Sequence, residues 1–150
     1  MAVASGFNSA WGNVSVRDVY YPSSEGTMLH GQLFLPKGVS SANPAPAILN
    51  MHGGSDYLQM VGTYSIELAR RGYVVLSVDA YGSGSSAYLS GGAAANAGGS
   101  GKENNSALKL DGGVSTGLEQ LLTYKFVDQE NIGMIGHSMG GTYVANAALE

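Results

Sequence analysis

The chain has 150 residues, a net charge of −4 at pH 7 and no cysteine. This length suits one domain, although α/β folds often need roughly 200–250 residues to close as one unit. The seven Lys and Arg residues form no stripe that could follow a phosphate backbone, so we expect no nucleic-acid partner. The absence of cysteine excludes disulfides, thiolate chemistry and Cys-ligated zinc.

No stretch of the sequence has the apolar length of a signal peptide or a membrane span. The residues given favour the cytoplasm, although the compartment stays open, because a targeting or membrane segment could have been removed at either end. We expect residues 1–13 to form an N-terminal extension and residues 14–150 to belong to a single domain.

The first predicted elements are two strands. Val14–Tyr21 and Met28–Pro36 are rich in β-branched and aromatic residues, and Ser23–Gly26 between them has the composition of a hairpin turn. We therefore expect an antiparallel pair at the start of the domain.

A strand, a helix and a second strand follow. Ala47–His52 is the first strand, and Tyr73–Asp79 is a nearly continuous apolar run, typical of a parallel strand buried on both faces. Between them, Ser55 or Asp56 can cap a helix and Gly72 can end it. The apolar side of that helix is given by Leu58, Val61, Ser65 and Leu68.

The last third of the chain predicts one more α/β unit and a final helix. A glycine-rich loop from Ala80 to about Asn105 precedes a helix marked by Leu110, Val114, Leu118 and Leu121, which Gly112, Gly113 and Gly117 weaken by roughly 1 kcal/mol each. The strand Asn131–Gly136 and the helix Thr142–Leu149 end the chain. The pattern predicts a mostly parallel α/β sheet with helices on both faces and an antiparallel N-terminal hairpin.

The strongest chemical motif is Gly136-His137-Ser138-Met139-Gly140. Between a strand and a helix, such a motif holds a nucleophilic serine on a strained turn, and the residues two before and two after it must be small so that the chain can pass close by. The helix that follows supplies free N–H groups and a positive dipole end. In a loop the motif could be chance, but here the preceding strand and following helix favour the nucleophile, Ser138.

A second motif, His52-Gly53-Gly54-Ser55, directly follows the first parallel strand. Its glycines let backbone N–H groups point into a site, so we expect Gly54, and after it Gly53, to form an oxyanion hole with the N–H of Met139. Alone, the motif would be an ordinary strand-to-helix turn.

None of the three histidines is expected to act as the base. His52 directly precedes the glycine turn, and we expect its side chain to brace that turn. His137 occupies the variable position of the serine motif, and His30 lies inside a strand.

Two glycine-rich stretches come close to phosphate-binding patterns without matching them. Gly82-Ser-Gly84-Ser-Ser-Ala87 has the spacing of a dinucleotide fingerprint, but the residues that follow make a poor helix and no acidic residue ends another strand about 20 residues later. Gly99-Ser100-Gly101-Lys102 lacks the Ser or Thr that a phosphate loop needs after its lysine. We expect no organic cofactor and no metal.

The ordered series PAPAILNMHGG, ELARRGYVVLSVDAYGSGSS and VDQENIGMIGHSMGG resembles the α/β-hydrolase superfamily, closest to its bacterial dienelactone-hydrolase-like and acyl-peptidase-like branch. The resemblance covers the chain from about Val16 onward. It implies a catalytic triad in the order Ser, Asp or Glu, His, with the last two on strands after the serine turn. It also implies a structural role for Asp79, which ends a strand before that turn.

The resemblance therefore predicts an amino-terminal fragment of a serine hydrolase that cleaves an ester, a lactone or an amide. Ser138 would attack the carbonyl, and the acid and histidine of the triad would lie beyond residue 150, leaving this chain inactive by itself. The alternative is a non-catalytic binding or assembly piece that keeps only the turn. A serine at this position argues against the carboxylate nucleophile of dehalogenases and epoxide hydrolases.

In the family, the strand Asn131–Gly136 is central, with further strands along its free side. In this chain we expect that side to be an unpaired apolar edge, which favours self-association.

Overall fold

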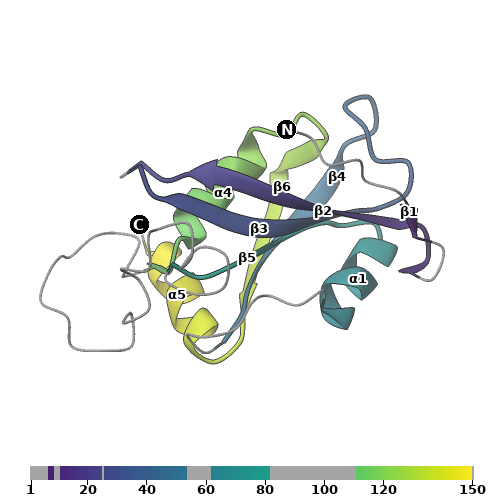
Figure 1. The fold of residues 1–150 in the computed structure, drawn as a ribbon. Coiled ribbons are helices and arrows are strands. Elements are labelled where there is room, and N and C mark those ends of the chain that lie inside the picture. Colours follow the sequence, from purple (N-terminus) through teal and green to yellow (C-terminus); the bar gives the residue numbers. More distant parts are fainter. Residues whose placement is uncertain (1–6, 9–10, 25, 54–61, 82–110, 150) are drawn as a thin grey trace, which may run out of the picture.

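The computed structural model describes residues 7–8, 11–24, 26–53, 62–81 and 111–149. These residues form one six-stranded sheet, in the order β1-β2-β3-β5-β4-β6, with helices packed against it (Figure 1). The strands are β1 (Phe7–Asn8), β2 (Val14–Pro22), β3 (Met28–Leu35), β4 (Ala45–Met51), β5 (Val74–Val78) and β6 (Val127–Gly136). The helices are α1 (Thr63–Arg70), α4 (Val114–Leu122) and α5 (Met139–Ala147).

The predicted N-terminal hairpin is confirmed. β2 and β3 pair antiparallel from Ser15 opposite Leu35 to Pro22 opposite Met28. Their turn is closed by Ser23, whose Oγ accepts the N–H of Thr27 at 3.1 Å. β1, which lies in the predicted N-terminal extension, pairs with the outer side of β2.

The remaining strands make the sheet a mixed one. β5 pairs antiparallel with β3, whereas β4 pairs parallel with β5 on one side and with β6 on the other. The predicted α/β class is confirmed, and the parallel part consists of β5, β4 and β6 within the described residues. β6 lies at the end of the strand order, so its second side has no partner strand in that part of the chain.

Two strands begin earlier than the sequence predicted. β6 starts at Val127, not at Asn131, because residues 128–131 are polar and mostly exposed at the sheet edge and therefore show no apolar pattern. β4 starts at Ala45, and its register with β6 shifts between Ala45 and Ala47. The residue at the shift is Pro46, which has no N–H to give to a ladder.

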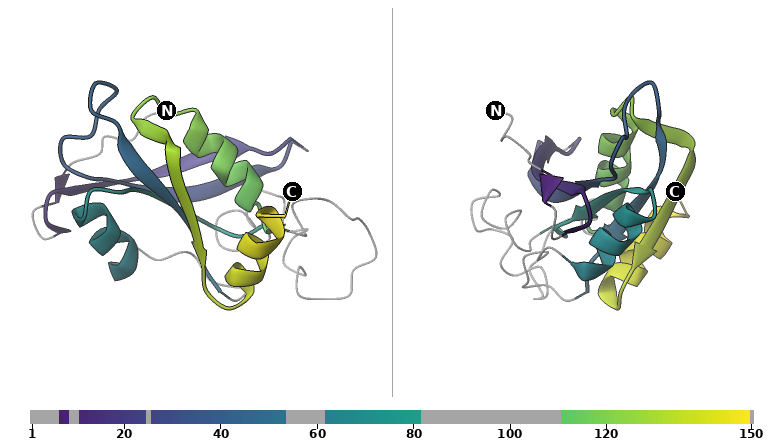
Figure 2. Two further views of the ribbon diagram at one scale, coloured as in Figure 1. Left: turned by 180° about the vertical axis from the view of Figure 1, so that it is seen from behind. Right: turned by 90° about the vertical axis from the view of Figure 1, so that its right-hand side faces the viewer.

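Helices cover both faces of the sheet. Figure 1 shows α1 in front of the sheet, and the view from behind in Figure 2 shows α4 and α5 on the other side. On the α1 face, Ile66 and Ala69 pack with Phe34 and Val75 in a small buried cluster. The larger core lies under α4 and α5 and contains, among others, Leu33, Leu49, Leu76, Val114 and Leu121. No helix among the described residues is long and apolar enough to cross a membrane.

The end of α1 follows the sequence prediction. Gly72 has a φ of 97°, its N–H donates to the Ala69 carbonyl, and the N–H of Tyr73 donates to the Leu68 carbonyl. This is the glycine-terminated hydrogen-bond pattern that commonly closes helices. The predicted caps Ser55 and Asp56, and the apolar positions Leu58 and Val61, lie outside the described residues.

The second predicted helix begins later than expected. Gly112 and Gly113 have φ values of 64° and 91°, which an α-helix does not allow, so α4 starts at Val114. Asp111 takes the capping role: its buried carboxylate accepts the N–H of Gly113 at 2.8 Å and the N–H of Ser115 at 2.7 Å. Gly112 and Gly113 therefore form the entry to the helix, whereas Gly117 lies in its interior, as the sequence predicted.

Candidate active site

Ser138 occupies a sharp turn between β6 and α5. Its φ of 54° and ψ of −122° are unusual for a residue with a side chain, and Asn13 is the other non-glycine residue with positive φ in the described part of the chain. Such a conformation costs on the order of 1–3 kcal/mol and persists only where the surrounding structure enforces it. Ser138 is exposed, so the strained turn presents its hydroxyl at the carboxyl end of the strand.

The glycines on either side of Ser138 allow this turn. A Cβ added at Gly136 would collide with the backbone of Gly140 and Gly141. A Cβ added at Gly140 would collide with the His52 carbonyl and lie 2.5 Å from the Met51 carbonyl oxygen, at the end of β4. The turn therefore closes on itself and also packs directly against the neighbouring strand.

The glycine turn after β4 lies beside the serine. A Cβ built on Gly53 would lie 2.9 Å from the Cβ of Ser138 and 2.7 Å from the His137 carbonyl oxygen. The structure thus brings together Gly53 and Ser138, which the sequence placed at the ends of two different strands. Gly54, the first choice for the oxyanion hole, lies outside the described residues.

Met139, the other expected oxyanion donor, is the first residue of α5. The first N–H groups of a helix have no acceptor inside that helix, and the helix dipole places partial positive charge there. The turn around them is held by the N–H groups of Gly140 and Gly141, which donate to the carbonyls of His137 and Ser138.

His52 braces the glycine turn, as the sequence indicated. The N–H of Ala80 donates to His52 Nε2 at 3.1 Å, and His52 Nδ1 lies 3.2 Å from the Gly53 carbonyl oxygen. Since a backbone N–H can only donate, Nε2 is unprotonated and Nδ1 carries the proton. His52 therefore links the end of β4 to the end of β5 as a neutral imidazole.

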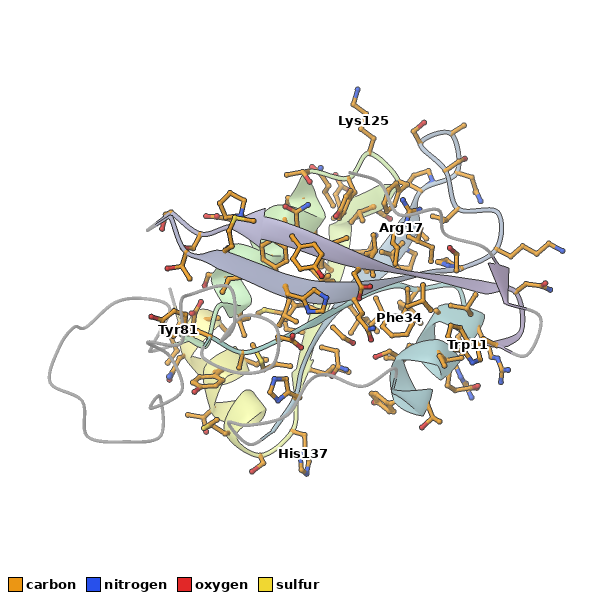
Figure 3. The ribbon with its side chains drawn as sticks, in the orientation of Figure 1. Trp11, Arg17, Phe34, Tyr81, Lys125 and His137 are labelled. Carbon is orange, nitrogen blue, oxygen red and sulfur yellow. The ribbon has the colours of Figure 1, made fainter. Side chains whose placement is uncertain are left out.

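His137 and His30 lie elsewhere. Figure 3 shows His137 on the turn after β6, at the outer edge of the molecule, and its side chain is exposed. His30 is buried on β3. Within the described residues, no side chain is hydrogen-bonded to the Ser138 hydroxyl, and no three His, Cys, Asp or Glu residues are grouped as a metal site would require.

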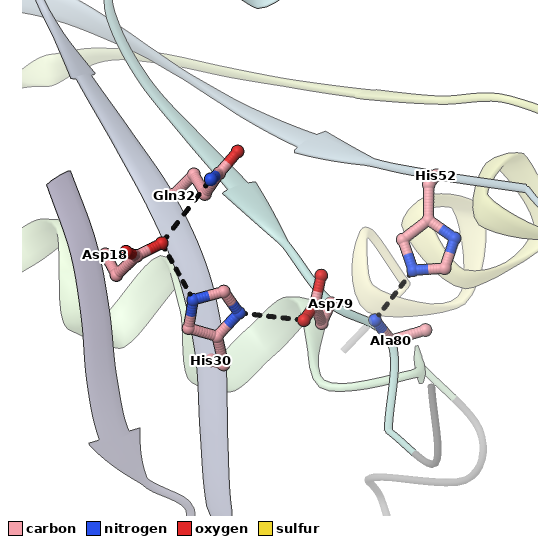
Figure 4. A network of polar contacts seen from close by, with 6 residues as sticks. All are labelled: Asp18, His30, Gln32, His52, Asp79 and Ala80. Carbon is pink, nitrogen blue, oxygen red and sulfur yellow. Dashed lines mark hydrogen bonds and ion pairs between the residues drawn. The ribbon is translucent and has the colours of Figure 1, made fainter. Parts of the chain in front are cut away.

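A buried polar network surrounds His30, and nothing in the sequence pattern indicated it (Figure 4). Its Nδ1 lies 2.8 Å from Asp79 Oδ2, and its Nε2 lies 3.1 Å from Asp18 Oδ1. Burial alone would lower the pKa of His30, but the hydrogen bonds and charges of Asp79 and Asp18 outweigh that effect and raise it. His30 can contact both carboxylates only when β3 lies between β2 and β5. The network could therefore have been predicted only from the order and register of these three strands.

An open cavity of about 460 Å³ lies next to the serine turn, on the α1 side of β4 and β6. Ser138 is not among its lining residues, so the cavity flanks the turn and does not enclose the hydroxyl. Among the described residues, its walls include Asn50, Met51, His52, Gly53, Tyr64, Ile135, Gly136 and His137.

Comparisons with known proteins agree with this fold. The family model described as acetyl xylan esterase (AXE1) matches residues 6–150. The Escherichia coli K12 protein YcjY is 29% identical over 117 residues, which cover 78% of this chain and 35% of YcjY. Both findings extend over most of the described sheet.

Solved structures share the architecture. The acetyl xylan esterase from Paenibacillus sp. R4 superposes with a TM-score of 0.68 at 20% identity, covering 90% of this chain and 45% of the esterase. The acylaminoacyl peptidase of Pyrococcus horikoshii superposes with a TM-score of 0.66 at 23% identity, covering 88% of this chain and 21% of the peptidase. The chain thus spans less than half the length of these relatives.

Proposed function

This chain belongs to the acetyl xylan esterase (AXE1) family of α/β-hydrolases, and from that membership we propose that it carries the nucleophile of a serine hydrolase, Ser138. The substrate class is an ester, a lactone or an amide, and the family description favours an acetyl ester. The observation that carries the proposal is the conformation of Ser138: an exposed serine at φ 54° between a strand and a helix, packed against Gly53.

In the proposed reaction, the Ser138 hydroxyl attacks the substrate carbonyl and forms an acyl-enzyme, which water then hydrolyses. The N–H groups of Met139 and of the Gly53-Gly54 turn stabilise the negative oxygen of the tetrahedral intermediate, assisted by the amino end of α5. Removing one such donor from a serine hydrolase typically lowers kcat by about 10²–10³-fold.

The proton of Ser138 needs a base, and we propose that a histidine and an acid outside the described residues supply the rest of the triad. Two observations support this. His30 and His52 hold hydrogen bonds in structural networks, and the chain spans 45% of the related Paenibacillus esterase. On this proposal residues 1–150 alone are inactive, because the oxyanion hole and binding without a complete triad leave only about 10³–10⁴-fold catalysis over water.

The test compares residues 1–150 with the protein expressed from its complete reading frame. The substrate is p-nitrophenyl acetate, and a fluorophosphonate probe reports the reactive serine. We expect turnover and labelling from the complete reading frame, both lost in Ser138→Ala. Thr142→Ala, which removes an exposed hydroxyl one turn further along α5, is the matched control and should retain both.

Retained activity in Ser138→Ala would refute Ser138 as the nucleophile. A complete protein that neither hydrolyses the ester nor is labelled by the probe would favour the alternative, a binding or assembly piece that keeps only the turn. If residues 1–150 hydrolyse the ester at ordinary enzyme rates, the proposed location of the base is wrong. His137 would then be the first residue to test, since it adjoins Ser138.

We also propose that the isolated chain associates with itself through β6. The strand ends the sheet within the described residues and carries half-buried Ile132, Met134 and Ile135, and an unpaired strand of this kind is a template for another chain. Gly133→Lys places a charge on this edge where an added Cβ meets nothing within 4 Å. Light scattering after size exclusion should show assemblies of residues 1–150 that Gly133→Lys reduces, whereas a monodisperse monomer at all concentrations would refute the proposal.

A further inference from the structure

The protonation of His30 follows from its neighbours. Both of its ring nitrogens face carboxylate oxygens, Nδ1 toward Asp79 and Nε2 toward Asp18. A neutral imidazole has one N–H and one lone pair, so it can satisfy only one of two ionised carboxylates. A doubly protonated ring satisfies both, and it also balances one of the two negative charges around it.

His30 is hydrogen-bonded to Asp79 through both its main chain and its side chain. The Asp79 N–H donates to the His30 carbonyl at 3.0 Å, while His30 Nδ1 meets Asp79 Oδ2 at 2.8 Å. The Asp79 side chain is fully buried, whereas the Asp18 side chain is about half exposed, at 48%. These contacts of His30 with Asp18 and Asp79, which we call the His30 clamp, therefore fix Asp79 at the carboxyl end of β5 from the neighbouring antiparallel strand, β3.

The residue after Asp79 is part of the glycine turn's support. The N–H of Ala80 donates to His52, which contacts the carbonyl of Gly53, and Gly53 packs against Ser138. Figure 4 shows the two hydrogen-bonded groups side by side, joined through the peptide between Asp79 and Ala80. A displacement of Asp79 therefore shifts the donor on which His52 depends.

We propose that His30, protonated and hydrogen-bonded to both Asp18 and Asp79, is a positioning residue for the oxyanion turn: it fixes the Asp79-Ala80 peptide, which through His52 holds Gly53 against Ser138. This inference rests on the proposed hydrolase function. It assigns to the N-terminal hairpin a role in catalysis, although the hairpin contributes no group that touches the substrate.

The clamp makes the turn sensitive to a rise in pH through the pKa of His30. Among the described residues, His30 faces Asp18 and the Tyr20 ring on β2, whose centroid lies 4.9 Å from the imidazole, and Asp79 after β5. The pKa of His30 is raised above its usual value, mainly because the two carboxylates overcome the effect of burial. Above that pKa the ring keeps one N–H for two carboxylates, so it no longer holds Asp18 and Asp79 together, and the restraint on the Asp79-Ala80 peptide weakens.

The experiment uses the protein from its complete reading frame and three variants. His30→Gln removes the charge, Asp18→Asn removes one carboxylate and keeps His30 and Asp79, and Gln32→Ala is the control. Gln32 is on the same face of β3 as His30, and its amide lies 3.4 Å from Asp18. If His30→Gln fails to fold, Asp18→Asn still tests the inference, because its altered carboxylate is at the surface.

Ester hydrolysis is measured against pH, with spontaneous hydrolysis subtracted. In the wild type kcat should fall on the alkaline side of the His30 pKa. In His30→Gln, kcat should be about 10- to 100-fold lower with little change in KM, because small displacements of catalytic groups affect the transition state most, and the alkaline fall should disappear. In Asp18→Asn the fall should move to lower pH, and Gln32→Ala should match the wild type. An unchanged alkaline fall in His30→Gln, or a rise in KM alone, overturns the inference.

A second readout does not depend on catalysis. Nitrogen NMR of the histidine rings should show His30 protonated on both nitrogens at neutral pH and His52 protonated on Nδ1 alone, with this single state of His52 lost in His30→Gln. A neutral His30, or an unchanged His52, overturns the inference. If the wild type hydrolyses no ester, the proposed function fails and the NMR result alone decides whether His30 positions the turn.

Discussion

Replacing Gly140 with alanine tests how tightly the serine turn packs against β4. The added Cβ would collide with the His52 carbonyl and lie 2.5 Å from the Met51 carbonyl oxygen. These are backbone atoms of a central strand, so they cannot rotate away as a side chain would. Overpacking typically costs about 1–3 kcal/mol, and rigid neighbours place this site at the upper end.

The matched control is the next residue. A Cβ at Gly141 would have its nearest neighbour, the Gly136 carbonyl oxygen, at 3.4 Å, which is ordinary van der Waals contact. Both glycines lie in α5 with negative φ, so alanine brings each the same helix-propensity gain, up to about 1 kcal/mol. We expect Gly140→Ala to destabilise the protein by about 2 kcal/mol and Gly141→Ala to stabilise it by about 0.5–1 kcal/mol.

Urea unfolding and thermal melts measure both variants. At about 2–4 °C per kcal/mol for a chain of this size, the two melting temperatures should differ by about 5–12 °C. A Gly140→Ala variant that melts at or above the wild type would show that the turn has room to move, and the tight packing inferred between α5 and β4 would be wrong.

Three further predictions concern stability. Folding raises the pKa of His30, so the protonated ring's contribution to the free energy of unfolding is fully present below the unfolded pKa of about 6.5 and is lost as pH rises through the folded pKa. The difference in the free energy of unfolding between the wild type and His30→Gln should therefore shrink with rising pH, and a constant difference would contradict this. Asp111→Ala removes the acceptor of two N–H groups at the start of α4, so urea unfolding should show a loss of about 1–2 kcal/mol, with Asp111→Asn in between; equal stability of all three would contradict the cap. The buried Tyr21 hydroxyl has no hydrogen-bond partner within the described residues, so Tyr21→Phe should leave stability unchanged or raise it by about 1 kcal/mol, and a loss above that would reveal a partner.

The sequence predicted the fold best where local pattern and tertiary structure agree. β2, β3 and β5 have regular apolar patterns, and their positions were predicted to within a residue or two. At β6, residues 128–131 are polar, and only pairing with β4 makes Val127 the start of a strand. For α4, glycine content indicated a weak helix, whereas positive φ at Gly112 and Gly113 showed that they precede it.

The candidate site also has a part that the local sequence predicted and a part that depends on strand order. Ser138 and the glycines around it could be predicted, because a strained turn demands small neighbours in the sequence itself. The His30 clamp could not, since Asp18, His30 and Asp79 are brought together by the order of three strands. Gly54 keeps its predicted role only as a hypothesis, because it lies outside the described residues.

The order of the strands also bears on where chemistry can occur. From β4 the chain crosses one face of the sheet through α1 to reach β5 on one side, and it later crosses the other face through α4 to reach β6 on the opposite side. The helices that follow these two neighbouring strands, α1 after β4 and α5 after β6, lie on opposite faces of the sheet. Such a topological switch point is where open α/β sheets bind ligands. Gly53 and Ser138 lie together at this point because of chain topology, so new substrates could be accommodated by changing the side chains around them while the sheet stays the same.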